Sequence, residues 1–345
     1  MKILIIGGTG IISAAISRRT LELGWELTHL NRGNRPPESW RAPKGPGKFN
    51  QIICDISNEE DAAKKIAGLE FDAVADFIAY APEDVQRDFR LFKGKTRQYF
   101  FISSASAYQK PLANHKITEG TPLANPHWEY SRQKIACEEF LLKVYRDEGF
   151  PITIVRPSHT YDECKVPLGV HGTKGSWQVM KRIIDGKTVI IHGDGTSLWT
   201  MTSSTDFARA FTGLVGNIHA IGESVQITSD ETISWNQIYQ SIANALGKPL
   251  KAVHVSSEFL AKAGPHYDFT GALIGDKSVS VVFDTTKIKT LVPDFCAAIR
   301  FDQGIRETIA HILAHPELQA EDPEFDAFCD KVIAAQEKAL QEILA

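Results

Sequence analysis

The sequence predicts an α/β protein with a Rossmann-type, doubly wound parallel sheet and a smaller C-terminal substrate lobe. Two observations support this prediction. The chain opens with a short run rich in β-branched residues, Lys2 to Ile6, which stops at Gly7 and is followed by a stretch of helical periodicity up to Gly24. Apolar strand patterns then alternate with helical patterns, and this alternation implies right-handed crossovers and a parallel sheet.

The remaining elements are expected in regular order. Strands are predicted at 26–30, 51–54, 71–79, 97–103, 188–191 and 225–228, and helices at 59–67, 82–92, 128–149, 174–184 and 206–215. Ser234 and Gln237 form a capping-box pattern that opens a further helix. The expected organisation is a dinucleotide-binding domain (1–157, with a return at 187–216), a substrate lobe (158–186 and 217–315) and a helical tail (316–345).

Composition indicates an ordinary globular protein. The chain has 345 residues, of which 43% are hydrophobic and 23% charged, and a net charge of −4. This balance gives no general attraction for nucleic acid or a membrane surface. Because Met1 and Lys2 lead directly into a strand and no apolar run reaches spanning length, we expect a cytoplasmic protein. His311 and His315 are spaced for a metal, but no third ligand accompanies them and we expect no metal site.

The turn after the first strand carries two glycines, Gly7 and Gly10, with Ser13 where a third glycine is usual. Glycines allow a tight turn and a close approach to a pyrophosphate, whose charge would meet the free N–H groups of Ile11 and Ile12 at the start of the helix. The turn therefore predicts an NAD(P) site. The alternative is a tight turn that binds no ligand.

The ends of the second and third strands bear on the choice of cofactor. Asn31 stands where an acid would accept from the free ribose hydroxyl of NAD, and Arg32 and Arg35 can pair with the 2′-phosphate of NADP. We therefore expect NADP to be favoured over NAD, the alternative being that both arginines are solvated loop residues. Asp55 and Ile56 follow the third strand and are expected beside the adenine, although Asp55 also fits a solvated strand end.

Tyr130 and Lys134 lie four residues apart on a predicted helix, so both side chains share one face. The ammonium would favour the phenolate and lower the pKa of the tyrosine. Ser104 and Ser106 follow the strand at 97–103, at the edge of the sheet where ligands of such folds bind. Together these residues predict a catalytic set of Ser104, Tyr130 and Lys134.

These motifs resemble the extended short-chain dehydrogenase/reductase family, which holds the sugar-nucleotide epimerases and dehydratases. The similar segments are GGTGIIS, FISSASAY, YSRQK, IVRPSHTY and GDGT. The resemblance implies that Tyr130 is the acid/base, that Lys134 binds the nicotinamide ribose and that Ser104 holds the substrate oxygen. It also places Pro157 and His159 beside the nicotinamide and implies a homodimer.

The chain departs from the family pattern at the substrate side. Ala105 and Ser106 stand where 4,6-dehydratases carry an Asp-Glu pair, so water elimination is not expected. Trp199 stands where an arginine usually meets the substrate diphosphate. His159 replaces an asparagine and His171 follows in a glycine-containing loop, so one of these imidazoles could donate a proton near neutral pH. Ser106, His159, His171 and Trp199 are therefore the candidate substrate residues.

The expected function is that of an NAD(P)-dependent epimerase or oxidoreductase acting by hydride transfer on a secondary alcohol or ketone of a sugar-like small molecule, with or without a nucleotide. The alternative is a cofactor-binding, RNA-associated protein without turnover, because the glycine turn and Asn31-Arg32-Gly33 are also similar to the chloroplast stem-loop-binding branch of the family. The acidic balance and the intact Tyr-Lys pair speak against an RNA partner.

Overall fold

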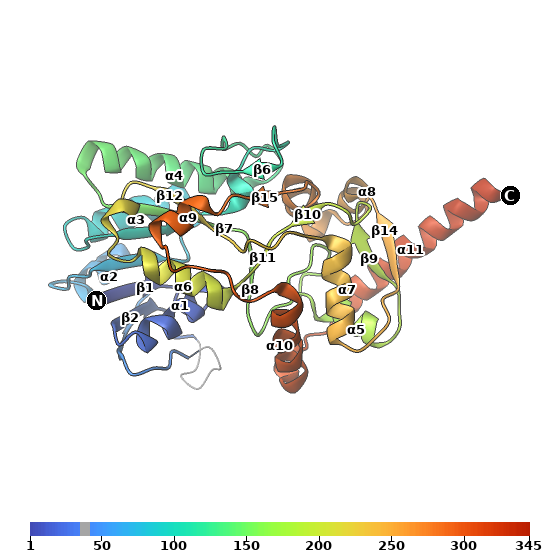
Figure 1. Ribbon diagram of the computed structural model, residues 1–345, viewed down its shortest axis with the longest axis horizontal. Coiled ribbons are helices and arrows are strands. Elements are labelled where there is room, and N and C mark those ends of the chain that lie inside the picture. Colours follow the sequence, from blue (N-terminus) through green and yellow to red (C-terminus); the bar gives the residue numbers. More distant parts are fainter. Residues whose placement is uncertain (35–41) are drawn as a thin grey trace.

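The computed structural model describes residues 1–34 and 42–345, and its central feature is a parallel sheet of seven strands (Figure 1). The order across the sheet is β12-β7-β5-β4-β1-β2-β3. The strands are β1 (Lys2–Ile6), β2 (Glu26–Asn31), β3 (Lys48–Ile53), β4 (Ala73–Asp76), β5 (Tyr99–Ile102), β7 (Ile152–Pro157) and β12 (Ser224–Ile227). Because the chain proceeds outward from β1 in one direction and from β4 in the other, the switch point lies between these two strands. The predicted Rossmann-type fold is confirmed.

Helices cover both faces of the sheet, which explains why its strands are apolar almost throughout. One face packs on α1 (Ile11–Glu22), α6 (Ser204–Leu214) and α9 (Thr286–Leu291), and the other on α2 (Glu59–Lys65), α3 (Pro82–Phe92) and α4 (Glu129–Glu148). Ile16, Phe100 and Phe211 are buried in the first layer. Phe92 and Leu141 are buried in the second.

Element ends follow from local chemistry. Helix α4 ends before Gly149, which has a φ of +67°. Glycine adopts this left-handed conformation at low cost because it has no side chain. Strand β4 stops earlier than predicted, at Asp76, because the carboxylate of that residue accepts hydrogen bonds from the N–H groups of Ile78 and Ala79 and turns the chain. Ser234 and Gln237 form the predicted capping box.

The C-terminal lobe has its own buried core, which includes Trp235, Ile238 and Ile305. Its elements are two-stranded pairs and helices: β6 (Lys116–Ile117) with β15 (Val282–Phe283), β8 (His159–Tyr161) with β11 (Met201–Ser203), β9 (Val189–His192) with β14 (Ala252–Val255), β10 (Leu198–Trp199) with β13 (Ile233–Ser234), and α5 (Trp177–Ile184), α7 (Trp235–Ala245), α8 (Ser257–Ala263) and α10 (Phe301–Ala314). The expected domain boundaries stay predictions.

A π-helix, η4 (Thr270–Lys277), packs against Trp128, the residue before α4. Its Gly271 lies so close to the indole of Trp128 that a Cβ there would overlap the ring, and a Cβ on Gly275 would lie 3.3 Å from Asn125 Oδ1. Single-turn π-type segments occur frequently at functional sites. The sequence analysis did not predict this element.

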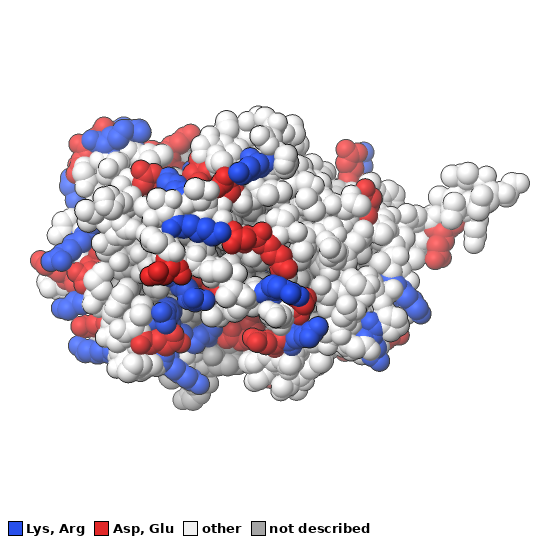
Figure 2. Space-filling model, in the orientation of Figure 1, with Lys and Arg blue, Asp and Glu red and all other residues white. Residues whose placement is uncertain are grey.

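The tail forms α11 (Pro323–Leu344), which follows a 3-10 turn at Pro316–Leu318. Its first half packs on the lobe through Phe325, Cys329 and Val332, whereas its last turns project away from the body (Figures 1 and 2). Among the described residues, no helix combines the length and apolar character needed to cross a membrane.

Candidate active site

The glycine turn between β1 and α1 has no side chains that would keep a ligand away from its backbone N–H groups. Gly7 has a φ of +75°, and a Cβ at this residue would lie 2.5 Å from Ile78 Cγ2. A Cβ on Gly8 would overlap the imidazole of His29. The N–H of Ala14 makes the first intrahelical bond, to Gly10 O at 3.0 Å, so the N–H groups of Ile11 and Ile12 belong to the unpaired first turn. This cradle fits the pyrophosphate of a dinucleotide.

Ser13 has a structural reason to stand at the third glycine position. Its buried hydroxyl donates to the carbonyl of Gly7 at 2.8 Å and accepts from the N–H of Gly10 at 2.8 Å. The side chain therefore closes the turn on itself. A glycine would pack as closely here but would provide neither bond.

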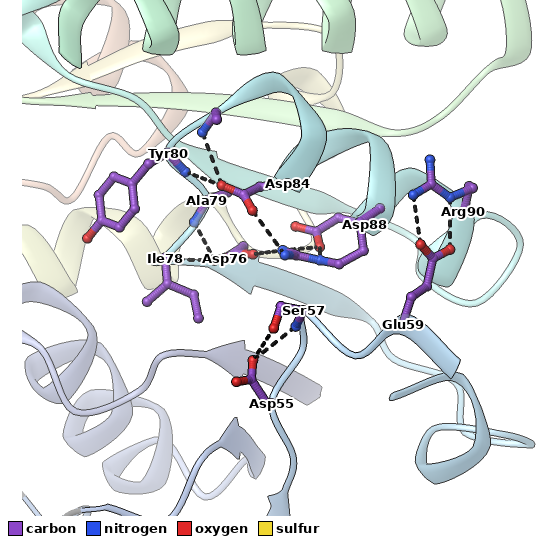
Figure 3. Close-up of polar contacts among 12 residues, drawn as sticks. Asp55, Ser57, Glu59, Asp76, Ile78, Ala79, Tyr80, Asp84, Asp88 and Arg90 are labelled. Atoms are coloured by element: carbon purple, nitrogen blue, oxygen red, sulfur yellow. Dashed lines mark hydrogen bonds and ion pairs between the residues drawn. The ribbon is translucent and has the colours of Figure 1, made fainter. Parts of the chain in front are cut away.

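The strand ends beside the turn hold the residues expected to choose the cofactor. Asn31 Oδ1 accepts from Gly33 N–H and from Gln51 Nε2, both at 3.0 Å, and Arg32 is exposed. Asp55 accepts from the hydroxyl of Ser57 at 2.7 Å (Figure 3), which, with the positive charge of Arg32 as a smaller contribution, lowers the pKa of Asp55.

Ile56 is buried in the core beside this edge, and Arg35 lies outside the described residues. Of the residues expected around the adenine ribose, the structure therefore gathers Asn31, Arg32, Asp55 and Ile56 at the ends of β2 and β3.

A buried charge cluster fixes the loop after β4 (Figure 3). The carboxylate of Asp76 accepts from Ile78 N–H at 2.6 Å and Ala79 N–H at 2.9 Å, and the guanidinium of Arg87 lies between Asp76, at 3.2 Å, and Asp88, at 2.8 Å. Burial, and then the negative charge of Asp88, raise the pKa of Asp76 well above its usual value. The loop thus held places Ile78 against the glycine turn.

The expected catalytic residues come together at the ends of β4 and β5. The Lys134 ammonium donates to Ala79 O at 2.6 Å and Ile102 O at 2.7 Å, and lies 5.7 Å from the ring centre of Tyr130. The hydroxyl of Ser104 is near enough to that of Tyr130 to influence the pKa of the phenol. Helix α4 supplies the tyrosine and the lysine, and the segment after β5 supplies the serine.

Burial decides the pKa values of this set. It raises the pKa of Tyr130 to about 12, a shift that the nearby Ser104 hydroxyl opposes, and it lowers the pKa of Lys134 to about 8. The expectation that Lys134 lowers the pKa of Tyr130 is therefore wrong for the protein alone. The physical reason is that desolvation of the phenol raises its pKa, and the nearby Tyr80 and Asp276 raise it further, whereas only Ser104 acts in the opposite direction.

Ser106 belongs to a hydroxyl network behind Ser104. The Oγ atoms of Ser104 and Ser106 lie 2.9 Å apart, and Ser131 Oγ donates to Ser106 Oγ at 2.8 Å. The amide of Asn125 donates to Ser106 O at 2.8 Å and to Gly275 O at 2.7 Å. Ser106 thus orients Ser104. Sequence reasoning missed Asn125, which lies in no named motif, and it assigned no role to Ser131 within YSRQK.

His159 and His171, which the sequence analysis offered as possible proton donors, lie near each other. His159 begins β8, directly after Pro157 and Ser158 at the end of β7. Burial, followed by the charges of Lys277 and Lys165, lowers the pKa of His159 well below its usual value. His171 Nδ1 donates to Gly172 O at 2.8 Å, and burial lowers its pKa as well. The expected titration near neutral pH is therefore contradicted for His159, because its ring is desolvated, and it stays a prediction for His171.

Trp199 lies in the same region, in β10. Its side chain is 2% exposed, and its ring centre lies 6.1 Å from that of Trp235. The ammonium of Lys110 stands 5.9 Å from the Trp199 ring centre. Lys110, Asp276 and Lys277 were not among the sequence-predicted residues, since only tertiary packing brings their segments to this place.

Metal ligands do not cluster in the part of the chain that the structure describes: no group of three His, Cys, Asp or Glu side chains could hold an ion there. His311 and His315 stack on each other with ring centres 3.9 Å apart. His315 Nδ1 donates to His311 O at 2.8 Å.

Comparison with known proteins gives relatives of two kinds. The chain is 25% identical over 298 residues to the 2′-dehydrokanamycin reductase of Streptomyces kanamyceticus, covering 86% of this chain and 80% of that protein. It is 26% identical over 260 residues to the chloroplast stem-loop binding protein of 41 kDa b of Arabidopsis thaliana, covering 72% of this chain and 64% of that protein.

The fold is shared with solved epimerase structures. An epimerase from Methanothermobacter thermautotrophicus superposes with a TM-score of 0.74 at 16% identity, covering 92% of this chain and 93% of that one. The sequence profile of one family matches residues 3–227, which is more than half of the chain. The protein belongs to the NAD dependent epimerase/dehydratase family.

Proposed function

We propose that the protein is an NAD(P)-dependent epimerase or reductase that transfers a hydride at a secondary alcohol or ketone of a sugar-like molecule. The observation that carries this proposal is the contact of the Tyr130 hydroxyl with Ser104, next to the buried ammonium of Lys134. A phenol, a hydroxyl and an ammonium arranged in this way can move one proton at one substrate oxygen. Elimination of water is not proposed, because Ala105 and Ser106 supply no acid.

In this mechanism each residue has a separate task. Tyr130 exchanges a proton with the substrate oxygen, and Ser104 holds that oxygen by a hydrogen bond. Lys134 anchors the cofactor's ribose and provides the positive charge that stabilises the phenolate during the reaction. The bound nicotinamide cofactor supplies or accepts the hydride. The hydroxyl network through Ser106 and Ser131 keeps Ser104 in position.

Turnover with a matched pair of variants tests the proposal. Reduced and oxidised cofactor are followed by absorbance with UDP-glucose, UDP-glucuronate, free hexoses and a 2′-keto aminoglycoside as substrates. Tyr130→Phe is expected to lose nearly all turnover while retaining cofactor affinity, whereas Tyr145→Phe, on the same helix but away from the site, keeps both. Full activity in Tyr130→Phe would reject the mechanism.

A related proposal concerns the cofactor itself: we infer a preference for NADP over NAD. Arg32 is exposed at the end of β2, and the oxygen of Asn31 already accepts two hydrogen bonds. An exposed guanidinium without a competing carboxylate at Asn31 supports binding of the 2′-phosphate. Mass spectrometry of the cofactor released from the purified protein decides between the two.

The second candidate is an RNA-associated protein without turnover, which the similarity to the chloroplast stem-loop binding protein favours. Charge argues against it: the net charge is −4, and on the face shown in Figure 2 Lys and Arg are interspersed with Asp and Glu. A salt-sensitive gel shift with a stem-loop RNA, combined with no turnover of any carbonyl compound, would reverse this ranking.

We also infer a homodimer, as the family resemblance implies, and, from the sequence pattern alone, a location in the cytoplasm. The exposed apolar side chains of Leu340, Ile343 and Leu344 at the projecting end of α11 support a self-association surface. Light scattering on the full chain tests the dimer, and a chain that remains monomeric at micromolar concentration would contradict it.

A further inference from the structure

Lys110 is a buried lysine whose ammonium has no hydrogen-bond acceptor among the described residues. Its side chain is 4% exposed, and it lies in the connection between β5 and α4. A buried ammonium is stable only if an acceptor compensates for the water it has lost. Burial accordingly lowers the pKa of Lys110. The protein therefore holds a strong donor in place without supplying its acceptor.

The nearest opposite charge does not satisfy this lysine. Asp276, at the end of η4, is close enough to raise the pKa of Lys110, but its Oδ1 also has no hydrogen-bond partner among the described residues. Its Oδ2 lies 3.4 Å from the ammonium of the neighbouring Lys277. Two lysines therefore share one carboxylate, and the cluster has an excess of positive charge.

A second donor without an acceptor lies on the same side of the site. The indole N–H of Trp199 is buried and has no partner in the described chain, and the Lys110 ammonium stands 5.9 Å from that ring. Two buried donors and one buried carboxylate oxygen without a donor match a ligand that has an oxyanion and, beside it, a hydroxyl group.

The cluster adjoins the reacting group. Lys277 Nζ lies 5.8 Å from the ring centre of Trp128, and the rings of Trp128 and Tyr130 are 5.0 Å apart. Asp276 is near enough to Tyr130 to contribute to its raised pKa. An anion at Lys110 would therefore belong to the same small molecule whose alcohol or ketone meets Tyr130.

We propose that Lys110 binds an oxyanion of the substrate, a carboxylate or a phosphate on the reacting sugar-like unit, with Trp199 N–H as a second donor and Asp276 as the acceptor for a neighbouring hydroxyl. The substrate class is therefore an acidic sugar or an acidic polyol. This inference rests on the proposed function for the reaction itself, but it concerns binding, which is measured without turnover.

Binding of three simple probes tests the inference. Thermal unfolding of the purified protein is measured with D-glucuronate, D-glucose 6-phosphate and D-glucose, at one concentration and with ionic strength balanced by sodium chloride. We expect one or both anions to raise Tm while glucose does not, and the Kd of the better anion, from calorimetry, to weaken about 10- to 100-fold in Lys110→Met. A response to both anions indicates that the site recognises carboxylate and phosphate alike. A response to one anion alone shows which of the two groups the site recognises.

Matched variants separate this role from a structural one. Lys110→Met is expected to raise Tm without any anion, because it removes a buried charge that lacks an acceptor, and Lys110→Gln should likewise lose the anion response. Lys64→Met, an exposed lysine on α2, serves as the control and should change neither value. The same titration in Tyr130→Phe should retain anion binding, so a failed binding test is distinct from a failed reaction mechanism.

Several results would overturn the inference. Equal responses to glucose and both anions would show that charge is not recognised. An unchanged anion response in Lys110→Met would place the anion elsewhere. A lower Tm in Lys110→Met without ligand would make Lys110 a structural partner of Asp276.

Discussion

His29 and Ser17 form a buried contact beneath the glycine turn: the imidazole Nε2 lies 2.7 Å from the serine Oγ. Because Ser17 Oγ donates to Ser13 O at 2.7 Å, the serine accepts its second hydrogen bond from His29 Nε2–H, and burial favours the neutral imidazole. Burial lowers the pKa of His29 to about 4. Gly8 of the cofactor turn packs directly against this ring. Protonation of His29 would place a charge in this buried position and would therefore disturb the packing beneath the turn.

This contact predicts an acid-sensitive stability. The folded-state pKa of about 4 lies below the unfolded value of about 6.5, so the unfolded chain binds more protons between these values. The contribution of His29 is fully present above pH 6.5 and is lost as the pH falls toward 4, with a total of about 3 kcal/mol. His29→Gln should flatten the pH dependence of the unfolding free energy in this window. A profile unchanged by the substitution would contradict the neutral buried imidazole.

Ser13→Ala is expected to loosen the glycine turn. The variant loses both hydrogen bonds of the hydroxyl, to Gly7 O and from Gly10 N–H, and should lower the unfolding free energy by about 1 to 3 kcal/mol. Cofactor affinity, followed by fluorescence titration, should fall as well, because the turn would no longer be preorganised. Ser241→Ala, on the exposed side of α7, is the control and should leave both quantities unchanged. Wild-type affinity in Ser13→Ala would show that the turn keeps its shape without the hydroxyl.

Arg32→Asp is expected to shift cofactor preference from NADP toward NAD. The substitution removes the guanidinium that would pair with the 2′-phosphate and adds a charge that repels it, so the ratio of the two dissociation constants should change by about tenfold or more. Arg97→Asp, an exposed arginine just before β5 that pairs with Asp72, provides a control of equal charge change. If the wild type prefers NAD and Arg32→Asp alters little, Arg32 is a solvated loop residue.

Asp76→Asn and Asp76→Ala should differ strongly in stability. Burial raises the pKa of Asp76 well above its usual value, and a neutral amide at this position can still accept from the N–H groups of Ile78 and Ala79. We expect the asparagine variant to lose less than about 1 kcal/mol and the alanine variant about 3 kcal/mol, because the alanine leaves buried N–H groups without an acceptor. Urea unfolding at neutral pH measures both, and equal losses would show that the carboxylate is charged.

Local patterns were sufficient to predict the sheet, and they also supplied the candidate catalytic residues, whose roles stay a prediction. The apolar run at Lys2 to Ile6, the glycine turn and the Tyr130-Lys134 spacing each lie within a short segment, where chain geometry alone decides which side chains share a face. The order of these segments along the chain was also sufficient to indicate the family. In each case the information is carried by neighbours in the sequence.

The fold decided what depends on burial and on distant segments. The pKa of Tyr130 is raised instead of lowered, and that of His159 falls well below neutrality, because desolvation depends on the layers packed around a side chain, which spacing does not reveal. Lys110, Trp199 and Asp276 come from segments far apart in the chain, and the π-helix that presents Asp276 has no periodic signal. The sequence by itself therefore determined the fold class and indicated Tyr130 as the candidate acid/base, whereas only tertiary packing brought the buried charges of Lys110 and Asp276 into its neighbourhood.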